Sequence, residues 1–283
     1  MRLPSITPRL LEAGLLTKPR RAILVDYFKS NWLDLSTVLS CLLASFMIYL
    51  FANPLMSREF PLYAGIDQTD FWIKHGKHLR REYISTLVSA VVSFGVPASI
   101  ILLCGILKVR NFQDTHNALM GLLYSLSASS LFQSVLKWTI GGLRPYFMAV
   151  CRPPMSLTSE GQILTWYDAQ ICTGDMKEVR EAQMSFPSGH SVAAFAGFGL
   201  VALYLNAKFG IFAPRPLNER VPFWQLGMVA FPVLAACVIA GSKVRDGWHH
   251  PEDVVAGSLI GSVFAYMAFK SAYPAVRREE KVG

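Results

Sequence analysis

Residues 84–107 read ISTLVSAVVSFGVPASIILLCGIL and contain no charged side chain. A helix needs about 20 mostly apolar residues to cross the hydrocarbon core of a bilayer, so this stretch predicts a transmembrane helix. Five further apolar stretches of similar length lie at 36–55, 117–136, 190–207, 223–241 and 254–273. We therefore expect an all-α integral membrane bundle of six transmembrane helices, and we prefer it to the alternative of a soluble helical bundle.

The composition supports this fold class. Of the 283 residues, 52% are hydrophobic and 16% are charged, whereas a soluble domain typically has about 25% charged residues. No internal repeat is visible, so one domain over 36–273 suffices, between tails at 1–35 and 274–283. The third and fourth stretches are rich in Ser, Ala and Gly, which let helices approach closely, and we expect these two in the interior of the bundle.

The distribution of basic residues predicts the orientation in the membrane. Residues 1–35 contain no long apolar run and are expected to be a cytosolic tail rather than a cleaved signal peptide. With that tail in the cytosol, 15 of the 27 Lys and Arg residues fall in the cytosolic segments 1–35, 108–116, 208–222 and 270–283. The net charge of +8 is then explained by topology and anionic headgroups. Without a nucleic-acid-binding motif we expect no nucleic-acid partner, and the oligomeric state stays open.

Two long connections are predicted outside the membrane on the other face. The connection 56–83 includes the basic run KHGKHLRRE at 74–82, interpreted as a solvated or interfacial helix face along lipid headgroups. The extracytoplasmic loop 142–189 contains Cys151 and Cys172, and in an oxidising compartment this placement permits a disulfide between them. The other three cysteines fall within predicted spans and are expected to be packing residues.

Two of the three motifs with chemical potential flank this loop. KWTIGGLRP at 137–145 carries Lys137 and Arg144 at the exit of the third span, although basic residues at such positions commonly act as interfacial anchors. SFPSGHS at 185–191 places Ser188 and Gly189 at the start of the fourth span, where exposed backbone N–H groups and the helix dipole favour an anion. His190 would stand beside that anion as a proton donor; the alternative is an ordinary capped helix start.

The third motif is GSKVRDGWHHPEDVVAG at 241–257, between the fifth and sixth spans. His249 and Asp253 are four residues apart and would share a face on the first helical turn, so the carboxylate can orient one imidazole nitrogen. The other nitrogen is then available as a nucleophile. Topology places all three motifs on one face of the membrane, the extracytoplasmic one in the orientation above, so they can form one site.

A metal centre is the competing interpretation of the third motif, because His249, His250, Glu252 and Asp253 are potential ligands. The cations of the three motifs would repel a divalent metal and attract a phosphate; they are Lys137, Arg144, Lys243 and Arg245. We therefore expect no metal and no cofactor, and we expect His250 to be structural.

In this order the motifs resemble the type 2 phosphatidate phosphatase superfamily, whose signature is K-x6-R-P, then P-S-G-H, then S-R-x5-H-x3-D. The chain matches at Lys137, Arg144, Pro145, Pro187, Ser188, Gly189, His190, Ser242, His249 and Asp253. It departs at Lys243, where the signature has arginine, and Arg245 is a candidate auxiliary cation. The surroundings GGLRPYFMAVC and DGWHHPEDV resemble the eukaryotic lipid phosphate phosphatase branch.

The resemblance implies magnesium-independent hydrolysis of phosphatidate, lysophosphatidate, diacylglycerol pyrophosphate or similar lipid phosphates. In the mechanism we expect, His249 attacks phosphorus to form a phosphohistidine, Asp253 orients it, and His190 protonates the leaving group. The phosphate ligands are then Lys137, Arg144, Lys243 and the backbone of Ser188 and Gly189. The protein would lie in the plasma membrane, vacuole, Golgi or endoplasmic reticulum, with the site facing the exterior or lumen.

Five alternatives stay open. The substrate could be a sphingoid-base phosphate, a polyprenyl diphosphate or a sugar phosphate. The protein could also be a catalytically silent membrane scaffold of the same fold, although such a protein is expected to have lost His190, His249 or Asp253. A small-solute transporter is the least favoured alternative, because the motif charges lie at span ends rather than at the midplane of the membrane.

Overall fold

Six long helices form most of the structure, a computed structural model that describes residues 20–62, 69–154, 165–214, 216 and 219–273. Each is long and apolar enough to cross a membrane, which confirms the predicted all-α, six-span architecture. They are α2 (Arg20–Phe51), α4 (Thr86–Cys104, continued by the π-helical turn Gly105–Val109), α5 (Phe112–Thr139), α8 (Gly189–Phe209), α9 (Phe223–Arg245) and α10 (Pro251–Ala272).

The chain divides into two compact units, 1–40 and 41–283, and the boundary falls within α2. In the first unit the described residues are the start of α2, where Ser36 and Thr37 donate hydrogen bonds to the carbonyl of Leu33. The helix begins at Arg20, before the predicted start of the first span near residue 36. The charged residues before that point had hidden the helix, because the prediction required an uninterrupted apolar run.

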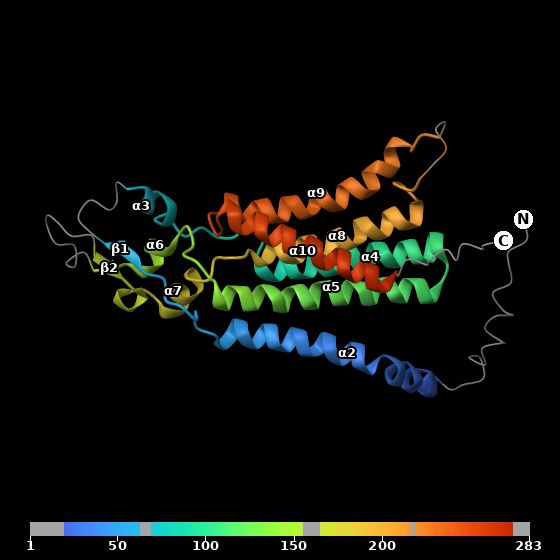
Figure 1. The fold of residues 1–283 in the computed structure, drawn as a ribbon, viewed down its shortest axis with the longest axis horizontal. Coiled ribbons are helices and arrows are strands. Elements are labelled where there is room, and N and C mark those ends of the chain that lie inside the picture. The colour runs from blue at the N-terminus through green and yellow to red at the C-terminus, as the bar shows by residue number, and fades with distance from the viewer. Residues whose placement is uncertain (1–19, 63–68, 155–164, 215, 217–218, 274–283) are drawn as a thin grey trace, which may run out of the picture. The chain divides into compact units, whose positions relative to one another are not determined.

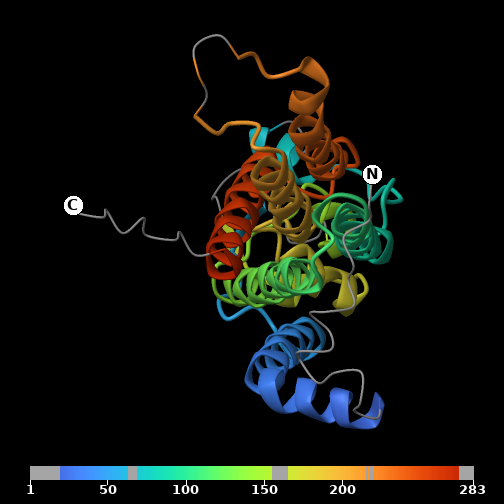
Figure 2. The same ribbon diagram turned by 90° about the vertical axis from the view of Figure 1, so that its right-hand side faces the viewer.

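In the second unit, α8 is the central helix and contacts α4, α5, α9 and α10. Figure 2 shows these four helices around it. We compared the buried share of the most apolar 18-residue stretch of each helix. This share is 56% in α8 and 39% in α5, but only 22–33% in α4, α9 and α10. This confirms that the small-residue third and fourth spans pack in the interior.

Close packing of α8 against α10 depends on glycine. Gly257 and Gly261 are four residues apart and lie on one face of α10. A Cβ atom added to Gly257 would stand 2.6 Å from the carbonyl oxygen of Ser188, and one added to Gly261 would stand 2.9 Å from the amide of Ala196. This small-xxx-small arrangement lets the two backbones approach, and it fixes the start of α10 beside the start of α8.

Short elements gather at one end of the bundle (Figure 1). We call them the end cap: β1 (Phe60–Leu62), α3 (Asp70–His75), α6 (Phe147–Cys151), β2 (Thr165–Tyr167), the 3-10 turn Ala169–Ile171 and α7 (Met176–Ala182). β1 pairs antiparallel with β2, with Pro61 opposite Trp166. The cap has its own apolar core around Phe60, Phe147 and Val179. A disulfide joins Cys151 to Cys172 within it, as the sequence permitted.

The basic run at 74–82 does not form the helix face that the sequence suggested. Only Lys74 and His75 belong to α3, and the following residues to Ser85 are not helical. This segment lies against the link between α9 and α10: the indole N–H of Trp248 donates to the carbonyl of Arg80 at 2.8 Å. The amide of Tyr83 donates to Asp246 at 2.7 Å. Tertiary hydrogen bonds replace helical ones here, which removes the reason for a helix.

Candidate active site

The first two motifs are joined through their backbones at the junction of the bundle and the end cap. The amide of Gly142 donates to Gln183 at 2.7 Å, and the amide of Ser185 donates back to Gly142 at 2.9 Å. Gly141 has φ +55° and its absent Cβ would lie 2.7 Å from the carbonyl of Gln183. Glycine is therefore required at Gly141 both for the left-handed turn and for the close contact.

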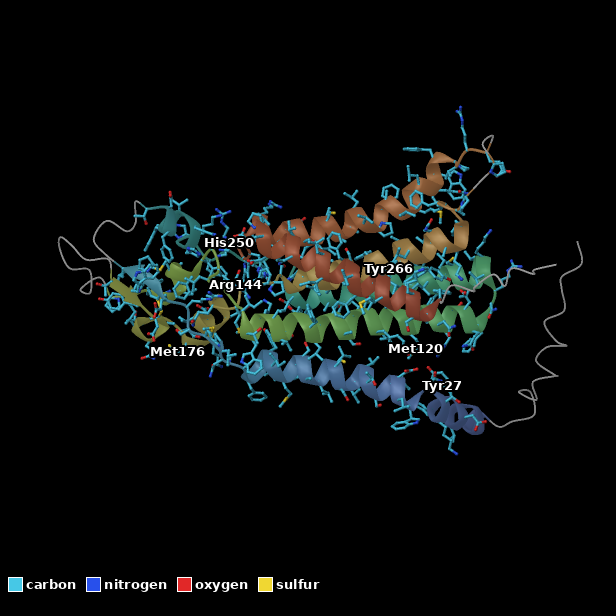
Figure 3. All side chains as sticks on the ribbon, viewed as in Figure 1. Tyr27, Met120, Arg144, Met176, His250 and Tyr266 are labelled. Carbon is cyan, nitrogen blue, oxygen red and sulfur yellow. A yellow bond between two sulfur atoms is a disulfide. The ribbon has the colours of Figure 1, made fainter. Side chains whose placement is uncertain are left out.

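The third motif is bonded to both of the others. The amide of Ser188 donates to the carbonyl of Asp253 at 3.0 Å, and Nε2 of His250 donates to the carbonyl of Leu143 at 3.1 Å. Figure 3 shows Arg144 and His250 together at the cap end of the bundle, while Met120 and Tyr266 lie along it. The three motifs thus meet at one end of the bundle, as their topology predicted.

His249 and Asp253 form a pair, although not on a shared helical face. α10 begins at Pro251, so His249 precedes the helix and Asp253, in its first turn, reaches back toward it. Nδ1 of His249 lies 3.5 Å from Oδ2 of Asp253. The same oxygen accepts hydrogen bonds from the hydroxyl of Ser185 at 2.6 Å and the amide of His250 at 3.0 Å. The carboxylate is therefore fixed from three directions.

This environment keeps the imidazole of His249 neutral. The side chain is buried, and burial holds its pKa well below the usual value, against the opposing effect of Asp253; the nearby cations Arg144 and Lys137 lower the pKa further. Because the pKa is lowered, the unprotonated ring persists through neutral pH and below it. A neutral ring whose Nδ1 faces a carboxylate leaves Nε2 with its lone pair, which is the form that a nucleophile requires.

His190 stands in the first turn of α8, behind the N-cap residue Ser188. The side chain is nine-tenths buried, and its Nε2 has no hydrogen-bond partner in the part of the chain that the structure describes. Of the two backbone donors that the sequence suggested, the N–H of Ser188 is already bonded to Asp253. The N–H of Gly189 is at the first helical position, where no intrahelical acceptor exists, so it is the better anion donor.

Lys137 and Arg144 approach the two imidazoles from the first motif, since both cations act electrostatically on His190 and on His249. The ammonium of Lys137 donates to the carbonyl of Met184 at 3.0 Å. Arg144 is 4% exposed, and its guanidinium lies over the ring of Trp248 at 5.3 Å. The site therefore holds a positive field around two imidazoles, which suits a phosphate dianion.

Arg144 is held by residues that the sequence did not point to. Its guanidinium donates to the hydroxyl of Tyr146 and to the carboxylate of Glu181, both at 3.1 Å. Burial raises the pKa of Tyr146 to about 12, so the phenol keeps its proton. The Nε atom of Arg144 has no hydrogen-bond partner among the described residues, which leaves a buried donor for an added acceptor.

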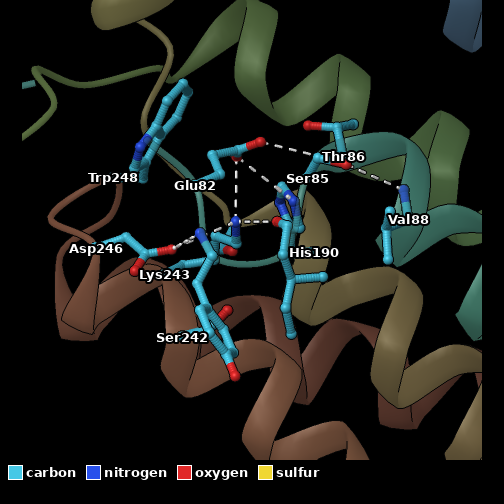
Figure 4. A network of polar contacts seen from close by, with 12 residues as sticks. Glu82, Ser85, Thr86, Val88, His190, Ser242, Lys243, Asp246 and Trp248 are labelled. Carbon is cyan, nitrogen blue, oxygen red and sulfur yellow. Dashed lines mark hydrogen bonds and ion pairs between the residues drawn. The ribbon is translucent and has the colours of Figure 1, made fainter. Parts of the chain in front are cut away.

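Lys243 stands where the family signature has arginine. It is fully buried in the last turn of α9. Its ammonium bonds to Oε1 of Glu82 at 3.1 Å and to the carbonyl of Ile84. Figure 4 shows it within this network, with Asp246 on its other side. The auxiliary candidate Arg245 lies over the ring of Tyr83 at 5.2 Å, and its side chain is exposed. Both remain predicted phosphate contacts, but each already has an internal partner.

Glu82 is the functional candidate that sequence reasoning missed. It ends the basic run before α4, and its Oε1 atom also lies 3.6 Å from Nε2 of His190, as Figure 4 shows. Its Oε2 atom accepts the amide of Thr86 at 3.2 Å. The only local signal was a single carboxylate among four basic residues at a span boundary, which by itself favours a surface ion pair.

The PAP2 superfamily pattern matches residues 118–277, a range that contains all three motifs. Lipid phosphate phosphatase 1 of Arabidopsis thaliana is 36% identical over 187 residues, which cover 65% of this chain and 53% of that protein. Phospholipid phosphatase 1 of Rattus norvegicus is 31% identical over 229 residues, covering 75% and 76%.

A third relative, the probable diacylglycerol pyrophosphate phosphatase 1 of Schizosaccharomyces pombe, is 29% identical over 253 residues, covering 88% of this chain and 84% of that protein. With the first three relatives the alignment spans 53%, 60% and 57% of their lengths. No solved structure matches the chain. The resemblance to the lipid phosphate phosphatase branch is confirmed by these relatives.

Proposed function

The chain belongs to the PAP2 superfamily, and on that premise we propose that it is a membrane lipid phosphate phosphatase. It hydrolyses phosphatidate, lysophosphatidate, diacylglycerol pyrophosphate or a similar lipid phosphate. The observation that carries the proposal is the buried His249–Asp253 pair, with the cations Lys137 and Arg144 near enough to act electrostatically on His249 and on His190. The acyl chains remain in the bilayer while the phosphate enters the site at the end of the helices.

In the first step, Nε2 of His249 attacks phosphorus and the bond from phosphorus to the lipid oxygen breaks. The electron pair of that bond goes to the lipid oxygen, which takes the proton of His190, and the alcohol leaves. In the second step, His190 removes a proton from water as the water oxygen attacks phosphorus. The phosphorus–nitrogen bond breaks, its electron pair returns to His249, and inorganic phosphate leaves.

The phosphoryl oxygens are held by the chain's own donors. Lys137, Arg144 and the amide of Gly189 supply fixed positive charge and a backbone N–H, preorganised in a buried site where such interactions are strong. Lys243 adds positive charge close by. The same work is done by metal ions in many phosphoryl-transfer enzymes, so we propose that this enzyme turns over without one.

The direct test compares two adjacent histidines. His249→Gln is expected to lower kcat on the order of 10⁴-fold or more, because the nucleophile is lost. His250→Gln is the matched control: its side chain bonds to the carbonyl of Leu143 and to the backbone of Asp253 in the cap of α10, and it has no role in the proposed chemistry, so the variant should retain most of the activity. Quenching the wild type with alkaline detergent, during turnover of a lipid labelled in its phosphate group, should trap an acid-labile phosphoenzyme that His249→Gln lacks.

Two results would contradict this mechanism. The first is a phosphoenzyme in His249→Gln. The second is full loss of turnover with a divalent-metal chelator, restored by the metal. A panel of phosphatidate, diacylglycerol pyrophosphate, sphingoid-base phosphate and polyprenyl diphosphate, assayed on the same purified protein, identifies the substrate. Absence of hydrolysis of the whole panel would instead support a silent scaffold.

We also propose that the end cap and the site face the lumen or the exterior. The Cys151–Cys172 disulfide lies in the cap, and disulfides persist in oxidising compartments. At the other end of the bundle the spans carry Lys108, Lys208 and Lys270, which agrees with a cytosolic excess of basic residues. The terminal segments 1–19 and 274–283 lie outside the described residues, and their cytosolic location rests on the same rule.

A further inference from the structure

Glu82 belongs to none of the three motifs, yet it joins two of them. Its Oε1 atom lies 3.1 Å from the ammonium of Lys243 and 3.6 Å from Nε2 of His190 (Figure 4). The side chain is 14% exposed, that of His190 is 9% exposed, and that of Lys243 is fully buried. Three charged or titratable groups this close and this deep interact far more strongly than surface ion pairs do.

The segment that carries Glu82 is fixed on both sides. Oε2 of Glu82 accepts a hydrogen bond from the amide of Thr86 in the first turn of α4. The carbonyl of Ile84 accepts a hydrogen bond from the ammonium of Lys243. The amide of Tyr83 donates to Asp246. The carboxylate therefore has little freedom to swing into solvent, and its place beside His190 is set by the fold rather than by chance.

His190 needs such a partner to act as an acid. Burial disfavours a protonated imidazole, and the nearby cations Lys243, Lys137 and Arg144 disfavour it further. Among the described residues Glu82 is the only carboxylate within 4.0 Å of the ring. A negative charge at that distance opposes the three cations, and it stabilises the imidazolium that must give its proton to the leaving oxygen.

We infer that Glu82 is the positioning residue that stabilises the protonated form of His190 in the proposed reaction, and that Lys243 acts by holding Glu82 in place. This inference rests on the proposed function, because it assigns a partner to the acid of that reaction. It also gives Lys243 a role that its burial explains: a lysine ammonium fits between Glu82, the carbonyl of Ile84 and Asp246. A forked guanidinium would need a different arrangement of acceptors.

The experiment compares two leaving groups in one enzyme preparation. The leaving group of phosphatidate is an alkoxide, which requires an acid, whereas the leaving group of its analogue with sulfur as the bridging atom is a thiolate, which requires almost none. Glu82→Gln keeps the size of the side chain and an acceptor for Thr86 but removes the charge. We expect a loss of about 10²-fold or more on the oxygen lipid, in the range of general acid catalysis, and less than about tenfold on the sulfur lipid.

The ratio of the two rates does not depend on how much protein is folded, so a less stable variant still gives an answer. His190→Ala should show the same selective loss, and the double variant Glu82→Gln/His190→Ala should lose no more than His190→Ala alone. The matched control is Glu252→Gln, which removes an exposed carboxylate paired with Lys74 and should leave both rates unchanged.

Equal losses on the two lipids, or no loss on either, would overturn the role of Glu82. An additional loss in the double variant would overturn it as well, since the two residues would then act independently. These outcomes are distinct from failure of the proposed function, which would appear as a wild-type protein that hydrolyses neither lipid.

Discussion

Asp253 shows how much a single side chain can organise in this protein. Its Oδ2 atom accepts hydrogen bonds from the hydroxyl of Ser185 and from the amide of His250, and it faces Nδ1 of His249. It therefore caps α10, and in the proposed mechanism it also selects the imidazole tautomer and orients the ring. Asp253→Asn is expected to lower kcat by about 10³- to 10⁴-fold, because an amide can no longer fix the nucleophilic tautomer, as in catalytic triads.

Thermal unfolding in detergent separates this loss from a loss of fold. The matched variant is Ser185→Ala, which removes one hydrogen bond to the same carboxylate and should cost about 1 kcal/mol of stability with a much smaller effect on kcat. A wild-type kcat in Asp253→Asn would mean that the carboxylate does not control the ring of His249.

The helix pair α8 and α10 sets the geometry between the two histidines. α8 begins one residue before His190 and α10 begins two residues after His249, and Gly257 lets the two backbones meet near Ser188. Adding a methyl group there, in Gly257→Ala, should push the helix starts apart. We expect destabilisation of about 1–3 kcal/mol from overpacking and up to about 10²-fold loss of kcat from misplacement near 1 Å.

Gly95→Ala in α4 is the control for this substitution, because a Cβ atom there would meet no atom within 4 Å. The melting temperature and kcat of both variants, measured in the same detergent, show whether the loss is specific to Gly257→Ala. If Gly257→Ala matched Gly95→Ala in both measurements, the α8–α10 contact would not control the site.

For the molecule as a whole, the direction of insertion decides which compartment supplies the substrate. Trp166 in the end cap is 55% exposed and Phe112 at the opposite end is 80% exposed. In sealed microsomes, whose outer face is cytosolic, Phe112→Cys should react with a membrane-impermeant maleimide directly. Trp166→Cys should react only after permeabilisation, in a background where the exposed Cys237 is replaced by Ala. The reverse pattern would place the site in the cytosol.

The six spans and the three motifs were predictable from the sequence because both are local properties. A helix in a bilayer must satisfy its own backbone hydrogen bonds and present apolar side chains, so each span is recognisable by itself. The spacing of Lys137 to Arg144 and of His249 to Asp253 likewise needs no knowledge of distant residues. Alternation across the membrane then placed the motifs on one face.

Only the tertiary structure could decide which distant groups meet inside that face. Glu82 is 161 residues from Lys243, and the donor at Ser188 is already bonded to the carbonyl of Asp253. His249 stands just outside the helix on which the pattern had placed it. The physical reason is that a charge or a hydrogen bond is defined by distance through space, and that distance is set by helix packing rather than by the order of residues along the chain.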